Sequence, residues 1–127
     1  MEKIENSKIK ETVYIETLDN GMKIIIIPKH ETRKKYIIWG AKIGSIDNHF
    51  IEPKTGREVK VPDGVAHYLE HKMFEQENGV DSLYKLMSLG LDANAYTTND
   101  HTAYLFGGTN NFYEGLDELM DYVQHPY

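Results

Sequence analysis

The five residues from 67 to 71, His-Tyr-Leu-Glu-His, combine two potential metal ligands with a potential general base. On a helix, His67 and His71 would differ by about 40° around the axis, so both imidazoles would project from one face. Zinc binds imidazole nitrogen, keeps an open position in catalytic sites and lowers the pKa of a bound water to about 7. Glu70 lies beside the pair and could accept the proton of that water. The pattern predicts a Zn²⁺ site with hydrolytic chemistry.

The same residues also have a purely structural interpretation. Histidines can lie at the edge of a core on an amphipathic helix, and a glutamate beside them can simply face water. Short motifs of this kind also arise by chance, so their structural context has to confirm them. The motif alone leaves open both a hydrolase and an α+β domain whose histidine pair is structural.

Composition limits the classes of function. The 127 residues can bury one modest core, and the net charge of −6 argues against a nucleic-acid surface. Because the chain contains no cysteine, any metal must be held by histidine and carboxylate. The first ten residues lack the apolar core of a signal peptide, and no apolar run has transmembrane length. We therefore expect a cytoplasmic protein that binds neither nucleic acid nor a membrane.

Alternating apolar residues predict strands in the first half of the chain. Residues 12–18 and 22–27 flank an Asp-Asn-Gly turn and are typical of a β-hairpin. Residues 24–27 are apolar on both faces, which favours a strand covered on both sides. A third strand is expected at 35–45, and the polar stretch 46–62 reads as a long connection.

The second half of the chain predicts the elements that would position the motif. They are a helix from Gly64 capped by Asp63, a helix capped by Asp81 or Ser82 and ended by Gly90, strands at 91–98 and 101–107, and a helix opened by an Asn111–Glu114 capping box. The expected order is ββ–β–αα–ββ–α. This order predicts an α+β fold in which helices pack on one mostly antiparallel sheet, with residues 1–127 in a single domain.

Longer stretches around the motif are more specific than its five letters. Residues 63–75, Asp-Gly-Val-Ala-His-Tyr-Leu-Glu-His-Lys-Met-Phe-Glu, precede Asp-Ala-Asn-Ala-Tyr-Thr-Thr at 92–98 and Thr-Ala-Tyr at 102–104. In this order they resemble the pitrilysin/insulysin family of inverzincin zinc metallopeptidases, which carry HxxEH, and especially its bacterial, processing-peptidase-like members. The resemblance extends from about Val13 to the last residue.

This resemblance implies a zinc-dependent endopeptidase that hydrolyses extended peptides or small unfolded proteins. His67 and His71 would be zinc ligands, and Glu70 would be the general base. Asn94, Ala95 and Tyr96 match the family's edge strand, which pairs with the peptide substrate. A free strand edge beside a metal is well suited to that task, because its backbone groups are unpaired.

The motif supplies two zinc ligands, whereas catalytic zinc sites usually have three. In the family that the chain resembles, the third ligand is a glutamate on a later helix, and we expect it beyond Tyr127. Glu75 is a weaker alternative, since it follows His71 by four residues on the same helix. The other acidic candidates are less suitable because they follow the motif helix or lie on a helix whose first turn is committed to capping: Glu77, Glu114 and Glu118.

The resemblance also implies partners. Family members comprise two homologous halves that close around the peptide, so we expect residues 1–127 to be a truncated N-terminal portion of one peptidase domain. The remainder of that domain and a second half would be supplied in cis or by a partner subunit. Alone, this portion is expected to bind zinc weakly and to be inactive. The alternative is a non-catalytic peptide-binding or partner subunit of the same fold.

Overall fold

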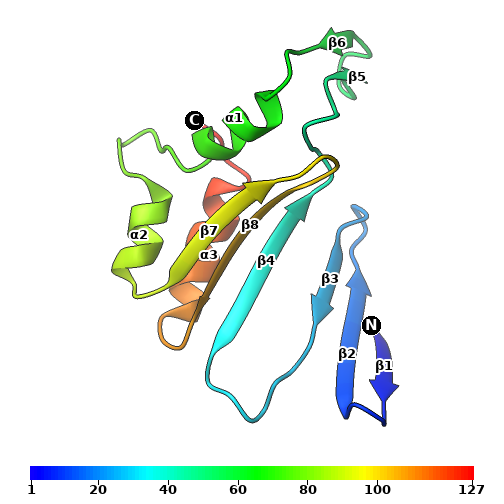
Figure 1. Cartoon of the computed structure of the whole chain (residues 1–127), viewed down its shortest axis with the longest axis vertical. Helices are drawn as coiled ribbons and strands as arrows, with labels where there is room; N and C mark the ends of the chain where they lie inside the picture. The colour runs from blue at the N-terminus through cyan, green and yellow to red at the C-terminus, as the bar shows by residue number, and fades with distance from the viewer. The chain divides into compact units, whose positions relative to one another are not determined.

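The computed structural model describes residues 1–127, in which six strands precede two helices, a pair of strands and a last helix (Figure 1). The strands are β1 (Glu2–Asn6), β2 (Glu11–Thr17), β3 (Lys23–Ile26), β4 (Lys35–Ala41), β5 (His49–Ile51), β6 (Glu58–Lys60), β7 (Asp92–Thr97) and β8 (Thr102–Gly108). The helices are α1 (Val65–Lys72), α2 (Ser82–Ser88) and α3 (Phe112–Tyr122), and none is long and apolar enough to cross a membrane. These elements divide between two units, residues 1–33 and 34–127.

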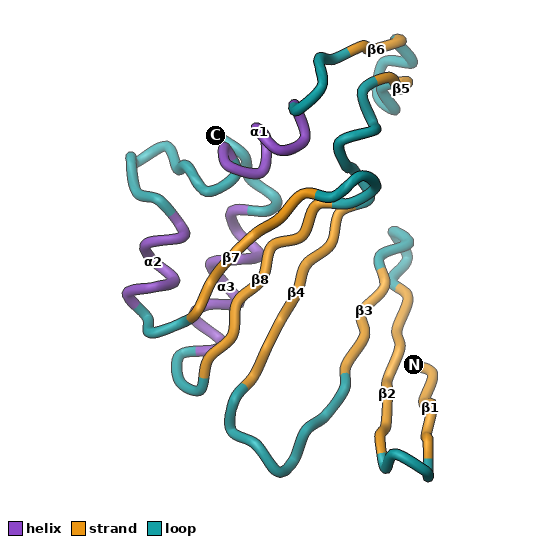
Figure 2. The backbone as a smooth tube through the Cα atoms, viewed as in Figure 1, coloured by secondary structure: helices purple, strands orange, loops and turns teal.

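The first unit is an antiparallel sheet in the order β1-β2-β3 (Figure 2). It contains the predicted hairpin, whose turn closes with a 2.8 Å hydrogen bond from the Leu18 N–H to the Met22 carbonyl. β1 was not predicted, because its sequence is mostly charged and polar. The expectation that residues 24–27 form a strand covered on both sides is wrong: β3 lies at the edge of this sheet, and Ile25 is 60% exposed. An apolar run does not by itself identify what covers it.

The second unit is built on an antiparallel sheet in the order β4-β8-β7, so β7 is an edge strand. α1 and α2 contact β7, while α3 contacts both β8 and α2. Between them lies a buried core formed by Met73, Phe74, Leu86, Leu91, Ala93, Tyr104, Phe106, Leu119 and Tyr122. The predicted α+β fold with antiparallel strands and packed helices is confirmed, although the strands are distributed over three sheets instead of one.

The connection that precedes α1 differs from its prediction in two ways. Within residues 46–62, β5 and β6 pair as a short antiparallel hairpin. Asp63 does not cap α1, because its Oδ1 accepts a 2.8 Å hydrogen bond from Asn48 Nδ2. Gly64 occupies the N-cap position instead, with a left-handed φ of 88° that favours glycine. The side chain of Asp63, which the local sequence pattern assigned to helix capping, is instead bound by Asn48, fifteen residues earlier in the chain.

The ends of the other two helices give one confirmation and one correction. Asp81 caps α2 as predicted, since its Oδ1 accepts the Leu83 N–H at 2.7 Å, and Gly90 follows the helix with a left-handed φ of 77°. The predicted capping box of α3 is wrong. Asn111 makes no side-chain cap, and its Nδ2 donates to the Leu89 carbonyl at 2.8 Å, which ties the start of α3 to the end of α2.

A buried polar pair joins α2 to α3 and gives a test of their packing. Ser82 is fully buried, and its Oγ donates to Glu118 Oε1 at 2.6 Å, while Lys85 forms an ion pair with Oε2. Because Ser82→Ala leaves that carboxylate oxygen buried without its donor, we expect the free energy of unfolding to fall by about 1–2 kcal/mol. Urea denaturation would measure it.

Ser88→Ala is the matched control for this change. Ser88 lies on the same helix, but its hydroxyl is exposed and donates only to the Lys85 carbonyl. We expect the control to change the free energy of unfolding by less than about 0.5 kcal/mol. Equal losses in the two variants would show that the Ser82–Glu118 hydrogen bond is not what stabilises this contact.

Candidate metal centre

α1 presents both histidines of the motif on its exposed face. The Nε2 atoms of His67 and His71 lie 3.1 Å apart, and their ring centroids are separated by 4.9 Å. Two zinc–nitrogen bonds of about 2.0–2.1 Å at a tetrahedral angle would place the nitrogens about 3.3 Å apart. The spacing and chemistry of this pair therefore fit a single zinc ion.

Glu70 lies on the covered side of the same helix. It is only 6% exposed, and its Oε2 accepts a 2.5 Å hydrogen bond from Thr97 Oγ1 on β7. Tyr104 of β8 is close enough to respond to this carboxylate: burial, and then the negative charge of Glu70, raise the pKa of Tyr104 to about 12. The phenol of Tyr104 therefore stays neutral at physiological pH.

A cavity of about 430 Å³ brings the motif and the edge strand together. It is lined by His67, Glu70 and His71, by Asn94, Ala95, Tyr96 and Thr97 of β7, and by Phe74, Asp81 and Leu83. All six residues that the sequence suggested for the site thus border one cavity, and their roles there stay predictions. At the strand edge, Asn94 Oδ1 accepts the N–H of Ala95 at 2.9 Å, so its amide lies along its own backbone.

Thr97 is the site residue that the sequence prediction missed. Along β7, Asp92, Asn94 and Tyr96 are exposed, whereas the alternate residues are buried or half-buried. Those alternate residues are two alanines and Thr97, so the threonine carries the one polar side chain on the covered face of the strand. The alternation of the strand was visible in the sequence, but the partner of the hydroxyl was not.

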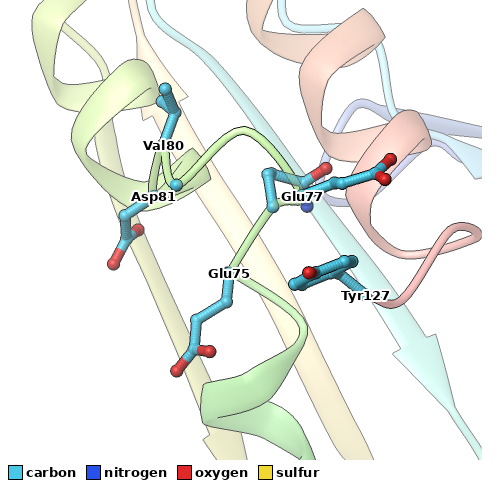
Figure 3. Close-up of a pocket in the computed structure, with 7 residues that line it drawn as sticks. Glu75, Glu77, Val80, Asp81 and Tyr127 are labelled. Carbon is cyan, nitrogen blue, oxygen red and sulfur yellow. The ribbon is translucent and has the colours of Figure 1, made fainter.

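The acidic candidates for a third ligand do not join the histidine pair. The structure has no group of three His, Asp or Glu side chains placed to hold a metal ion. Glu75 forms an ion pair with Lys72. Together with Glu77 it lines a second cavity of about 300 Å³, where the two carboxylates point in different directions (Figure 3). Both carboxylate oxygens of Glu118 are already bound, one to Ser82 and one to Lys85. The third ligand, expected beyond Tyr127, stays a prediction.

The premise that capping would occupy the first turn of α3 is also wrong. Asn111 forms no side-chain cap, and Glu114 is exposed on that turn. Glu114 forms no ion pair with either histidine of the motif, and it does not line the cavity around them. Its exclusion from the site therefore follows from its position on α3 and not from capping.

Comparison with known proteins identifies a family whose members are similar to this chain. A model of the insulinase family, peptidase family M16, matches residues 56–127, more than half of the chain. The uncharacterized zinc protease YmfH of Bacillus subtilis is 43% identical over 124 residues, which cover 98% of this chain and 29% of that protein. The chain thus spans less than a third of this relative.

Solved structures show the same likeness. An M16-like peptidase from Alicyclobacillus acidocaldarius superposes with a TM-score of 0.83 at 33% identity, over 98% of this chain and 28% of that one. Pitrilysin superposes with a TM-score of 0.74 at 22% identity, over 98% of this chain and 13% of its own, which is a likeness of fold. From its family match and its fold, the chain belongs to the insulinase family of peptidases, M16.

Proposed function

We propose that the protein containing this segment is a zinc-dependent endopeptidase that hydrolyses extended peptides. The observation that carries the proposal is the convergence of His67 and His71 Nε2, 3.1 Å apart, in one cavity with a buried carboxylate and a strand edge. Relatives that are named zinc proteases support the same chemistry. Each part of the cavity then has a task in peptide hydrolysis.

His67 and His71 would hold the zinc together with a third ligand from outside these residues. When bound, zinc would supply a Lewis acid and would lower the pKa of the attacking water. Glu70 would accept a proton from that water and later deliver it to the leaving amine, so that the peptide C–N bond breaks and the proton count balances. β7 would pair with the substrate backbone as an added strand, with Asn94, Ala95 and Tyr96 against the peptide.

The remaining assignments follow from this proposal. A complete centre needs the third ligand, which we assign to the remainder of the peptidase domain. A second homologous half, in cis or as a partner subunit, would close over the peptide. The substrates would be peptides or small unfolded proteins in the cytoplasm, because only an extended chain can pair with a strand edge.

Metal content and cleavage test the proposal together. We expect the full-length gene product to bind one zinc ion at this centre and to cleave an unstructured peptide; a zinc chelator should abolish cleavage and added zinc should restore it. Residues 1–127 alone should bind zinc weakly and show no turnover. Robust turnover by this segment would contradict the need for a third ligand. Peptide affinity without cleavage, unchanged by the chelator, would instead favour a non-catalytic peptide-binding subunit.

A further inference from the structure

We infer that Thr97 is a positioning residue for the general base: it holds Glu70 so that one carboxylate oxygen stays available to the attacking water. This inference rests on the proposed function and deepens it, since it assigns a task to a residue outside the histidine pair and outside the Asn94–Tyr96 strand segment. It is carried by one contact between α1 and the edge strand. That contact joins the base to the strand that would bind the substrate.

The donor in this contact can be assigned. Thr97 Oγ1 lies 2.5 Å from Glu70 Oε2 and 3.4 Å from Thr102 Oγ1. Thr102 uses its single hydroxyl hydrogen on the Ile43 carbonyl, 2.8 Å away. The hydrogen of Thr97 is therefore free to point at Glu70, and a carboxylate can only accept it. A short O–H···O⁻ hydrogen bond of this length belongs to the strong, charge-assisted class.

The hydrogen bond distinguishes the two oxygens of Glu70. Oε2 is committed to Thr97, whereas no protein donor is bound to Oε1. The buried side-chain atoms that lack any partner are Gln76 Nε2 and the Tyr122 hydroxyl, so Oε1 is not sealed in the interior. Glu70 lines the cavity together with the histidine pair. Under the proposed function, Oε1 is therefore the oxygen that would accept a hydrogen bond from the attacking water. A glutamate has three rotatable side-chain bonds, and anchoring one oxygen fixes where the other lies.

Thr97 is itself held firmly. It is the last residue of β7, paired with Thr102 in the β7–β8 ladder, and the hydroxyl of Thr102 fastens that end of the hairpin to the segment after β4. A peptide that adds to β7 would therefore dock on the strand that already orients the base. Positioning errors of about 1 Å can slow a reaction by roughly 100-fold, so this anchor matters for turnover and little for binding.

Thr97→Val and Thr97→Ser test the assignment in the full-length gene product. Valine keeps the shape and β-branching of threonine but removes the hydroxyl, whereas serine keeps the hydroxyl. We expect Thr97→Val to lower kcat by roughly 10- to 100-fold with KM and zinc content changed by less than about twofold, and Thr97→Ser to keep most of kcat. In a Glu70→Gln background, Thr97→Val should add little, because it acts through Glu70.

Three kinetic outcomes would overturn the inference: unchanged kcat in Thr97→Val, an equal loss in Thr97→Ser, or additive losses in the double variant. A crystal structure of Thr97→Val gives a readout that needs no activity. We expect the Glu70 carboxylate to leave its present position, and a carboxylate that stays in place would also overturn the inference. If the wild-type protein cleaves no peptide, the proposed function fails. The position of Glu70 in the crystal structure of Thr97→Val would still show whether Thr97 holds the carboxylate in place.

Discussion

Glu70→Gln is expected to reduce kcat for peptide hydrolysis by about 1,000-fold while zinc remains bound. Glutamine has nearly the same shape, and its side-chain oxygen can still accept the Thr97 hydrogen bond, so the fold around α1 should be preserved. Its amide, however, cannot take a proton from water. Steady-state kinetics on an internally quenched peptide, together with metal analysis of the purified protein, would separate loss of the base from loss of the metal.

Glu75→Gln is the matched control for this variant. Glu75 follows α1 and is exposed, and its carboxylate pairs with Lys72 instead of pointing at the histidines. We expect its kcat to stay within about twofold, because exposed ion pairs contribute little. Full activity in Glu70→Gln would remove Glu70 from the role of base. A loss of zinc in Glu75→Gln would instead show that this carboxylate serves the metal.

Gly44→Ala should lower the free energy of unfolding by about 3 kcal/mol. A Cβ at this position would lie 2.4 Å from backbone atoms of Asn99 and Asp100, and backbone in a tight turn cannot rotate aside as a side chain can. The close approach serves two hydrogen bonds, including one of 2.9 Å from the Ser45 N–H to the Thr98 carbonyl. The variant must therefore separate the segment after β4 from the β7–β8 turn. Chemical denaturation of residues 1–127 would measure the loss.

Gly40→Ala provides the comparison within the same strand region. Gly40 lies on β4, and a Cβ added there meets no atom within 4 Å. We expect its free energy of unfolding to be unchanged or slightly raised, since alanine restricts the unfolded chain. A loss in Gly40→Ala as large as that in Gly44→Ala would mean that both changes act through strand propensity and not through the contact with the turn.

Elements with strong local signals could be predicted from the sequence. The motif helix, the Asp81-capped α2 and the β7–β8 hairpin follow from periodicity and turn residues within a few positions. The expected caps at Asp63 and Asn111 failed for one shared reason: each side chain bonds to a residue far along the chain. Local propensity cannot anticipate such competition, because tertiary partners decide it.

The candidate site likewise has a part that could be predicted from the sequence and a part that could not. The convergence of His67 and His71 could be predicted because four residues make about one helical turn. The edge position of β7 could not be derived from the spacing of its residues, because it depends on β4 pairing with β8 across more than sixty residues. The same long-range pairing sets the environment of Thr97, which reads in the sequence as an ordinary strand residue.

α1 places its histidines and its glutamate in different surroundings: the histidines are exposed, whereas Glu70 is buried against β7. The conformational entropy lost in ordering the glutamate side chain is therefore lost once, when the segment folds, and not again in each catalytic cycle. The histidine rings, in contrast, keep access to solvent, so under the proposed function a metal ion would exchange there without disturbing the interior. Under the proposed function, metal exchange and the orientation of the base would thus depend on different contacts of one short helix.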